Sequence, residues 1–344
     1  MKKKGKISII DIAKELGVSK GTVSSVLNGK ATERRISEET QKVILEYIEQ
    51  SGFRPNSVAR SLRTGRTHII GMLVEDISNP FFASIAHLVE KKVAYAGYRI
   101  LLASTENDND NAAEALMTFW EQQVDGYIIV PSAELPVNFI AKILGQKPLV
   151  LFDRTIEAFK TNCVLIDNYD SMVMATKHLI ENRFRHIAFI TIESTQLQMK
   201  ERLRGYENTL LNEHLISYIL KVDRSFSNET IKEQIKNFIE KHPLVDAIIF
   251  STNYIALLGL QVLKEQKIRI PGKIGVIGFD ESPYYELINP AITSVVQPLN
   301  EMADCMVDLL MEQLNNGEKG LLTPKTIELN AVLMPRKSTG KHDV

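Results

Sequence analysis

The chain has 344 residues, of which 44% are hydrophobic and 24% charged, a composition typical of a soluble globular protein that excludes a largely disordered one. The length predicts two or three domains, and no apolar run reaches the roughly 18 residues that a membrane span needs. Cys163 and Cys305 are the only cysteines, so we expect no disulfide framework, no metal site and a cytoplasmic protein.

Charge is divided unevenly along the chain. Residues 1–66 contain 14 Lys and Arg against 7 Asp and Glu, a net charge of +7, whereas the remainder contains 27 against 35, a net charge of −8. A basic head on an acidic body is expected when one end binds nucleic acid and the rest stays away from the polyanion. A basic face that is merely solvated is the alternative.

Two short helices joined by a sharp turn are predicted between Ile9 and Leu27, because the apolar residues form two stripes at helical spacing. Gly17 suits the turn, and Ser19 suits the N-cap of the second helix. The outward face of that helix would carry small donors, one lysine and no carboxylate, which suits a DNA major groove. A helical hairpin that only packs is the alternative. The residues of this head expected to contact DNA are Ser8, Ser19, Lys20, Gly21, Thr22, Ser25 and Asn28.

A third helix is predicted from Ser37 to about Ser51, with Glu38 and Glu39 in its first turn, where carboxylates favour the positive helix end. The apolar positions expected to close a three-helix head are Val43, Ile44, Tyr47 and Ile48.

Residues 53–66 are interpreted as a linker that acts as a switch. After Pro55, residues 56–63 predict two turns of helix. An isolated helix is marginal even at about 12–15 residues, so this one is expected to form only against a partner copy and DNA.

From residue 69 onward, short apolar runs alternate with helical segments. The fold class predicted from this pattern is an α/β core of two doubly wound parallel-sheet subdomains, which follows an all-α helix-turn-helix head. The strand-like runs are 69–74, 98–103, 126–130, 149–152, 163–166, 186–191, 247–250 and 274–279. The helical stripes are 82–96, 112–123, 171–182, 201–212, 230–241 and 254–266.

The expected domains are a DNA-binding head at 1–52, a hinge at 53–66 and a core at 67–340. Within the core, subdomain one is expected at about 67–168 plus 297–325, and subdomain two at about 169–296 plus 326–340. Ligands of such sheets bind at the carboxyl ends of strands. There, Phe81 and Phe82 could form a wall against an apolar face of a ligand, and Asp153 with Arg154 could fix hydroxyl groups.

Several motifs, in this order and at compatible distances, make the chain resemble the lactose-repressor/galactose-repressor (LacI/GalR) family of bacterial transcription regulators. They are ISIIDIA (7–13), LGVSKGTVSSVLN (16–28), RPNSVARSLR (54–63), NPFF (79–82), RLRGY (202–206) and GFD (278–280). The resemblance implies a core similar to periplasmic sugar-binding proteins. It also implies hinge helices that pair across a dimer and press Leu62 into the minor groove.

The same resemblance assigns further residues. Around the hinge wedge it places Asn56, Ala59, Arg60 and Arg63 at the DNA. In the core it makes Arg202 the effector-binding arginine of an Arg-x-x-Gly pattern, while Asn253 and Asp280 match positions that hydrogen-bond hydroxyl groups. The alternatives are that Leu62 is an ordinary core residue, that Phe81 and Phe82 are core, and that Arg202 and Asp280 form an ion pair between the subdomains.

The sequence departs from the family pattern at several places, one of which is Lys20-Gly21 in place of bulkier base-reading residues. Ser25 stands where an arginine is common, which predicts a different operator preference. Tyr254 replaces the usual aspartate after Asn253. The loop at 29–35 is some three residues longer, and Arg34 and Arg35 could reach phosphate from it. Finally, no heptad-bearing tail follows Arg336, which favours a homodimer over a tetramer.

These features predict a sequence-specific DNA-binding regulator that represses carbohydrate-utilisation genes. We expect it to bind a pseudo-palindromic operator, with an affinity that a small sugar effector in the cleft controls. Control by a protein co-regulator and a carbohydrate-binding transport receptor are the alternatives. An enzyme and a cofactor are not expected, because the Walker, GxSxG and HExxH motifs are absent from the sequence.

Overall fold

A computed structural model describes residues 7–53, 61, 64–132, 142, 144–145, 147–156, 159–316 and 323–341. The chain forms two compact units that divide after Thr67. Among the described helices, none combines the length and the apolar character that crossing a bilayer requires.

The first unit contains the helices α1 (Ile9–Glu15), α2 (Lys20–Leu27) and α3 (Glu38–Ser51). Gly17 has a φ of 64°, a left-handed conformation that glycine adopts without strain, and it makes the turn between α1 and α2. Ser19 caps α2 by accepting a hydrogen bond from the Thr22 amide at 3.0 Å. The predicted turn at Gly17 and the predicted N-cap at Ser19 are both confirmed.

The core of this head includes Ile12, Val23 and Ile44, all with no exposed surface. Tyr47 and Ile48 pack against it as expected. The expectation for Val43 was wrong, since 46% of this residue is exposed. Successive helical residues point about 100° apart, so when Ile44 faces inward its neighbour faces solvent.

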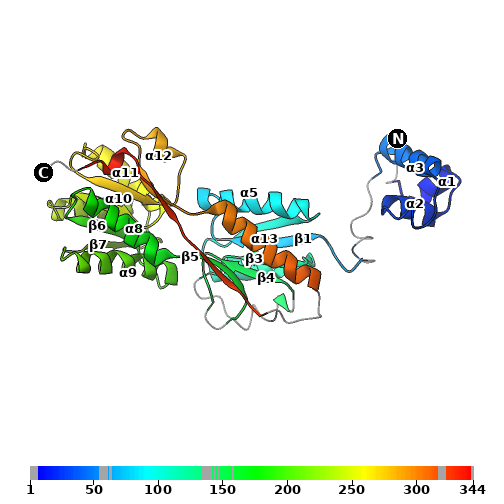
Figure 1. Ribbon diagram of the computed structural model, residues 1–344, viewed down its shortest axis with the longest axis horizontal. Coiled ribbons are helices and arrows are strands. Elements are labelled where there is room, and N and C mark those ends of the chain that lie inside the picture. Colours follow the sequence, from blue (N-terminus) through cyan, green and yellow to red (C-terminus); the bar gives the residue numbers. More distant parts are fainter. Residues whose placement is uncertain are drawn as a thin grey trace. The chain divides into compact units, whose positions relative to one another are not determined.

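The second unit contains two six-stranded sheets, one in each subdomain (Figure 1). The first has the order β11-β5-β4-β3-β1-β2, and its strands run parallel. Its strands are β1 (Ile69–Val74), β2 (Arg99–Ser104), β3 (Gly126–Ile129), β4 (Leu149–Phe152), β5 (Asn162–Ile166) and β11 (Thr326–Leu329).

The second sheet has the order β12-β10-β9-β8-β6-β7 and is parallel except for β12, which pairs antiparallel with β10. Its strands are β6 (Ile187–Ile192), β7 (Tyr218–Val222), β8 (Ala247–Phe250), β9 (Gly275–Phe279), β10 (Thr293–Val296) and β12 (Val332–Met334). The predicted doubly wound fold is confirmed, with this antiparallel edge as an addition.

Helices cover both faces of each sheet, as buried strands require. In the first subdomain, α5 (Pro80–Tyr95) packs with α13 (Leu299–Asn316), and α6 (Asn109–Glu121) contacts β1 and β2. Met72 and Val74 pack into the cluster with α5 and α13, while Leu73 packs with α6, so these helices lie on opposite faces.

In the second subdomain, two helix pairs pack on the sheet, followed by a short helix and a 3-10 turn. They are α8 (Asn168–Glu181) with α9 (Leu197–Asn212), α10 (Asn228–Lys241) with α11 (Asn253–Glu265), α12 (Tyr284–Leu287) and η2 (Lys337–Thr339).

The chain passes between the subdomains between β5 and α8, between β10 and α13, and between β11 and β12. The last passage is the long red segment of Figure 1. It comes later than the boundary at 325 that we expected, because β11 pairs with β5 and therefore belongs to the first sheet.

Candidate functional site

The N-terminal turn of α2 presents a small polar surface. Lys20 and Gly21 are exposed, and Thr22 and Ser25 are half-buried. The side-chain oxygens of Ser19 and Thr22 lie 2.8 Å apart, which orients both hydroxyls at the start of the helix. Because the side chains are short and glycine has none, a base edge can approach the backbone of this turn closely.

Two other predicted DNA contacts also hold the local fold. The Ser8 hydroxyl accepts from the Asp11 amide at 3.3 Å, and the Asp11 carboxylate accepts from the Ser8 amide at 2.9 Å, which makes a capping box at the start of α1. Asn28 ends α2, and its side-chain Nδ2 donates to the Ser24 carbonyl. The hinge residues Asn56, Ala59, Arg60, Leu62 and Arg63 lie outside the described residues.

In the core, a pocket lies between the two subdomains and collects most of the predicted effector residues. Those that line it are Phe81, Phe82, Asp153, Arg154, Arg202 and Asp280. Asn253 is placed differently: its Nδ2 donates to Asn79 Oδ1 at 2.8 Å, while its neighbours Thr252 and Tyr254 line the pocket.

Arg202 on α9 is buried and held from several directions. Its Nε donates to Asn168 Oδ1 at 2.8 Å, and Nη1 donates to the Ser251 carbonyl at 2.6 Å. The guanidinium carbon lies 3.5 Å from the centroid of the Phe279 ring, a cation–π contact. The remaining donors of this rigid fork are thereby fixed at the pocket wall.

The packing around Gly205 explains why the Arg-x-x-Gly pattern contains a glycine. A Cβ at this position would lie 2.4 Å from the Tyr169 carbonyl oxygen and 3.0 Å from the Met172 Cβ, both on α8. Only glycine therefore lets α9 approach α8 this closely. The close approach brings Arg202 within reach of Asn168, the first residue of α8.

Asp153 and Asp280 occupy matching places in the two subdomains, directly after β4 and β9. Their φ angles are 64° and 67°, in the left-handed region that costs a residue other than glycine about 1–3 kcal/mol. This backbone conformation directs both carboxylates into the same pocket. Burial raises the pKa of Asp280, while Arg202 and the hydrogen bond from Gln297 (2.6 Å) oppose that rise.

Opposite charges alternate along one wall of the pocket. Arg154 Nε lies 3.2 Å from Asp153 Oδ2, and Arg154 also forms an ion pair with the buried Glu75. Glu75 forms a second ion pair with Arg224, which follows β7 in the other subdomain. Two further hydrogen bonds join the subdomains, Asn79 to Asn253 and, at 3.0 Å, Gln196 Nε2 to Asn107 Oδ1.

The sequence reasoning missed several lining residues, notably Glu75, Gln196, Gln198 and Gln297. Gln198 and Gln297 are each 5% exposed, and their Oε1 atoms have no hydrogen-bond partner among the described residues. A buried acceptor without a partner is costly, so both oxygens favour a ligand that donates hydrogen bonds. Burial also raises the pKa of Tyr254, which keeps its hydroxyl protonated and able to donate.

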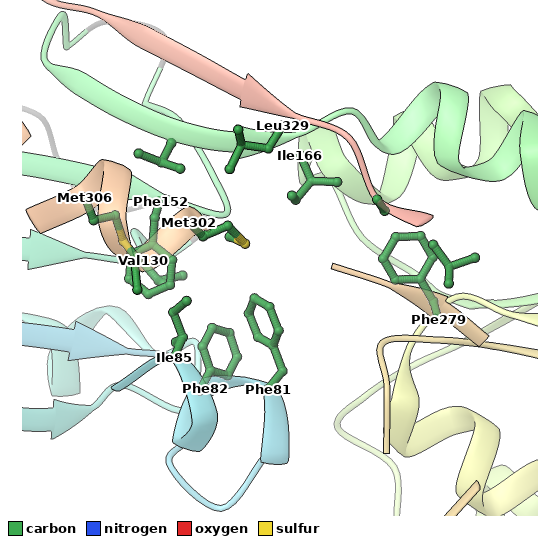
Figure 2. Close-up of a cluster of buried hydrophobic side chains, with 14 of the residues drawn as sticks. Phe81, Phe82, Ile85, Val130, Phe152, Ile166, Phe279, Met302, Met306 and Leu329 are labelled. Carbon is green, nitrogen blue, oxygen red and sulfur yellow. The ribbon is translucent and has the colours of Figure 1, made fainter. Parts of the chain in front are cut away.

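Phe81 and Phe82 begin α5 and serve two purposes. They are 6% and 4% exposed, and their rings make an edge contact with centroids 4.9 Å apart. Figure 2 shows both rings directed toward Val130, Phe152 and Met302, within the buried cluster, and the same residues line the pocket. The core and pocket interpretations are therefore compatible.

Comparison with known proteins agrees with this two-part organisation. Residues 8–56 match the family model described as "Bacterial regulatory proteins, lacI family", and residues 176–339 match the "Periplasmic binding protein-like domain". The HTH-type transcriptional repressor PurR of Aliivibrio fischeri is 31% identical over 316 residues, covering 90% of this chain and 93% of that protein.

Two solved structures extend the likeness over nearly the whole chain. The complex of the transcriptional regulator CelR with cellobiose is 26% identical, with a TM-score of 0.70, and the match covers 96% of this chain and 99% of that one. The lac repressor dimer bound to operator and the anti-inducer ONPF has a TM-score of 0.82 at 18% identity, covering 97% and 99%, which shows the shared fold.

The helix-turn-helix head and the two-sheet core thus define a DNA-binding transcriptional repressor with a core of the periplasmic-binding-protein type. The chain belongs to the LacI family of bacterial regulatory proteins.

Proposed function

We propose that a small polyhydroxylated effector, a sugar or a sugar derivative, binds the pocket between the subdomains and controls the repression of carbohydrate-utilisation genes. The observation that carries this proposal is a pair of buried oxygens at the pocket wall, those of Gln198 and Gln297, which have no hydrogen-bond partner in the described part of the chain. Hydroxyl groups of an uncharged ligand can donate to such oxygens and satisfy them.

The proposed roles follow from the donors and acceptors of each side chain. Asp280, Gln198 and Gln297 accept from effector hydroxyls, whereas Arg202 donates to effector oxygens. Asp153 and Arg154 contribute one acceptor and one donor from the first subdomain, and Asn253 acts through Asn79. Phe81 and Phe82 provide the apolar wall that a sugar ring can stack on.

At the other end of the chain, the proposed DNA contacts are those of α2 and its N-cap, supported by Ser8, Asn28 and the hinge. On α2 and its N-cap they are Ser19, Lys20, Gly21, Thr22 and Ser25. A homodimer in the cytoplasm presents two heads to a pseudo-palindromic operator. The effector joins residues of both subdomains, so it changes the relative populations of open and closed cores and thereby biases pairing of the hinges.

The test is a titration of the purified full-length chain with a panel of mono- and disaccharides. The readout is fluorescence anisotropy of a labelled operator that is selected from random-sequence duplexes. We expect one sugar to change operator affinity by about 5- to 150-fold, the usual range of allosteric coupling. A chain that binds operator but ignores every sugar, in anisotropy and in calorimetry, overturns the sugar proposal and favours a protein co-regulator.

The Arg202→Ala variant tests whether the effector acts through this pocket. It should keep operator binding and lose the response, because the arginine contacts only the core. Arg204→Ala on the same helix is the control, since its side chain is 58% exposed and should leave the response intact. If Arg202→Ala fails to fold, Gln297→Leu replaces it, and a normal response in that variant contradicts the pocket assignment.

A further inference from the structure

The loop between α2 and α3, residues 28–37, carries a group of cations that the fold does not use. Lys30, Arg34 and Arg35 are all exposed, and Glu33 is the single acid among them. None of the three cations forms an ion pair with a described residue, whereas Lys42 on α3 lies 3.9 Å from Glu46. The loop therefore presents a net positive surface with no partner in the described part of the head.

The backbone of this loop is firmly held. The Lys30 amide donates to the Ser25 carbonyl at 2.9 Å, the Arg34 amide to the Lys30 carbonyl at 3.1 Å, and the Ile36 amide to the Ala31 carbonyl at 2.9 Å. Ala31 is 5% exposed and belongs to the core of the head. The cations therefore project from a closed turn anchored at its centre, which lowers the entropy lost when they bind a ligand.

Arg35 adds a strained position to the loop. Its φ is 53°, in the left-handed region where an arginine is uncommon and costs about 1–3 kcal/mol. Its amide donates to the Thr32 carbonyl at 3.0 Å, so the strain is fixed by the turn. A glycine would relieve it but would lose the guanidinium, and such strain is common where a side chain must point at a ligand.

The loop begins beside the helix surface that faces DNA, since the Lys30 amide is bonded to Ser25 on α2. A helix inside the major groove has a phosphate backbone along each side, because that groove is only about 12 Å wide. We propose that Lys30, Arg34 and Arg35 form a phosphate clamp, which contacts the DNA backbone beside the groove that α2 enters. The clamp adds affinity without reading sequence.

The clamp predicts a specific salt dependence. Each phosphate neutralised on B-DNA contributes a slope of about −0.9 in log affinity against log salt concentration. The double variant Arg34→Gln/Arg35→Gln of the full-length chain should therefore flatten this slope by about 1 to 2, as measured by anisotropy between roughly 50 and 200 mM KCl. The loss should be the same factor on a selected operator and on a random duplex of equal length.

Two variants separate the clamp from a general charge effect. Lys42→Gln removes one positive charge from α3, where Lys42 lies 3.9 Å from Glu46, and should leave the slope unchanged. Arg34→Lys/Arg35→Lys keeps the charge and should retain most of the slope, which also shows that the loop tolerates substitution. An unchanged slope in the double glutamine variant, an equal change in Lys42→Gln, or a loss confined to the operator each overturns the proposal. Because random duplex suffices, these outcomes do not depend on an effector.

Discussion

Arg224 of the second subdomain and Glu75 of the first form an ion pair across the pocket. Glu75 is 5% exposed and also pairs with Arg154 of its own subdomain, so one buried carboxylate joins two guanidinium groups from opposite sides. Arg224 further lies over the Tyr254 ring, with its guanidinium carbon 5.3 Å from the centroid. This pair joins the two subdomains across the pocket in which we propose that the effector binds.

Arg224→Gln should therefore weaken closure. The Arg224 side chain is 35% exposed, so solvent screens the pair and its contribution is about 0.5–1 kcal/mol. We expect the radius of gyration of the effector-free chain to increase in small-angle scattering, and the effector Kd to increase by roughly two- to fivefold.

The matched control for this variant is Lys221→Gln. Lys221 lies 3.6 Å from Glu193, but this pair is more exposed and lies within one subdomain. It should change neither the scattering nor the Kd. Equal behaviour of the two variants would show that the Arg224–Glu75 pair does not control closure.

Gly205→Ala should disturb the pocket through the packing of two helices. The added Cβ would meet backbone of α8 at 2.4 Å, and backbone cannot move aside cheaply. Overpacking of this kind costs about 1–3 kcal/mol, which lowers the melting temperature by about 2–4 °C per kcal/mol. Because Arg202 would move with α9, the effector Kd should increase by more than about tenfold, while binding to random DNA stays unchanged.

Gly272→Ala is the control for the glycine substitution. A Cβ there would lie 3.6 Å from the Arg269 Cβ, an ordinary contact. Its melting temperature should match that of the parent chain within about 1–2 °C. A Gly205→Ala chain with normal stability and a normal effector Kd would remove the packing explanation of the Arg-x-x-Gly pattern.

Much of the fold could be predicted because buried parallel strands are continuous apolar runs. Four strands were missed: β7, β11 and β12 lie at the edges of their sheets, and the interior strand β10 begins with two polar residues, Thr293 and Ser294. β7 is an edge strand with an exposed Lys221 and mostly half-buried neighbours, and β11 is likewise an edge strand with a largely exposed face. Edge strands bury less surface, so their sequences carry less apolar pattern.

The pocket was predicted only in part, because the apolar pattern reveals only those residues that follow an apolar strand. Asp153 and Asp280 were found because each follows a recognisable apolar strand. Glu75 follows β1 in the same way, so the rule that found the two aspartates would have found it too. Gln297 follows β10, which the apolar pattern did not mark. The ion pair between Glu75 and Arg224 depends on how the two subdomains pack against each other. Local sequence does not encode that packing.

His178 makes the stability of the core depend on pH. Its Nε2 lies 2.8 Å from Thr339 Oγ1 and so ties α8 to the buried C-terminal turn η2. Burial lowers the pKa of His178, and Glu181 opposes this shift. The folded chain therefore binds the proton less well than the unfolded chain does. Stability is complete above the ordinary histidine pKa of about 6.5 and is lost as the pH falls toward the lowered folded value.

Urea unfolding of the core at pH 7 and pH 5 measures this effect. The parent chain should lose more unfolding free energy between these pH values than His178→Gln does, because the variant has no proton to take up at this site. His87→Gln, an exposed position on α5, is the control and should behave like the parent chain. Identical pH dependence in the parent chain and His178→Gln would show that another group is responsible.

Leu62→Ala tests the hinge; Leu62 itself lies outside the described part of the chain. If Leu62 opens a base step in the minor groove, its truncation removes an apolar wedge that only the bent operator accommodates. Operator affinity should then fall by about 5- to 150-fold, as expected for losing about 1–3 kcal/mol, whereas affinity for random duplex should change by less than about twofold. The salt slope should stay the same, since no charge is removed, and this separates the wedge from the phosphate clamp of residues 30–35. Equal losses on both duplexes would mean that Leu62 stabilises the head or the hinge without touching DNA.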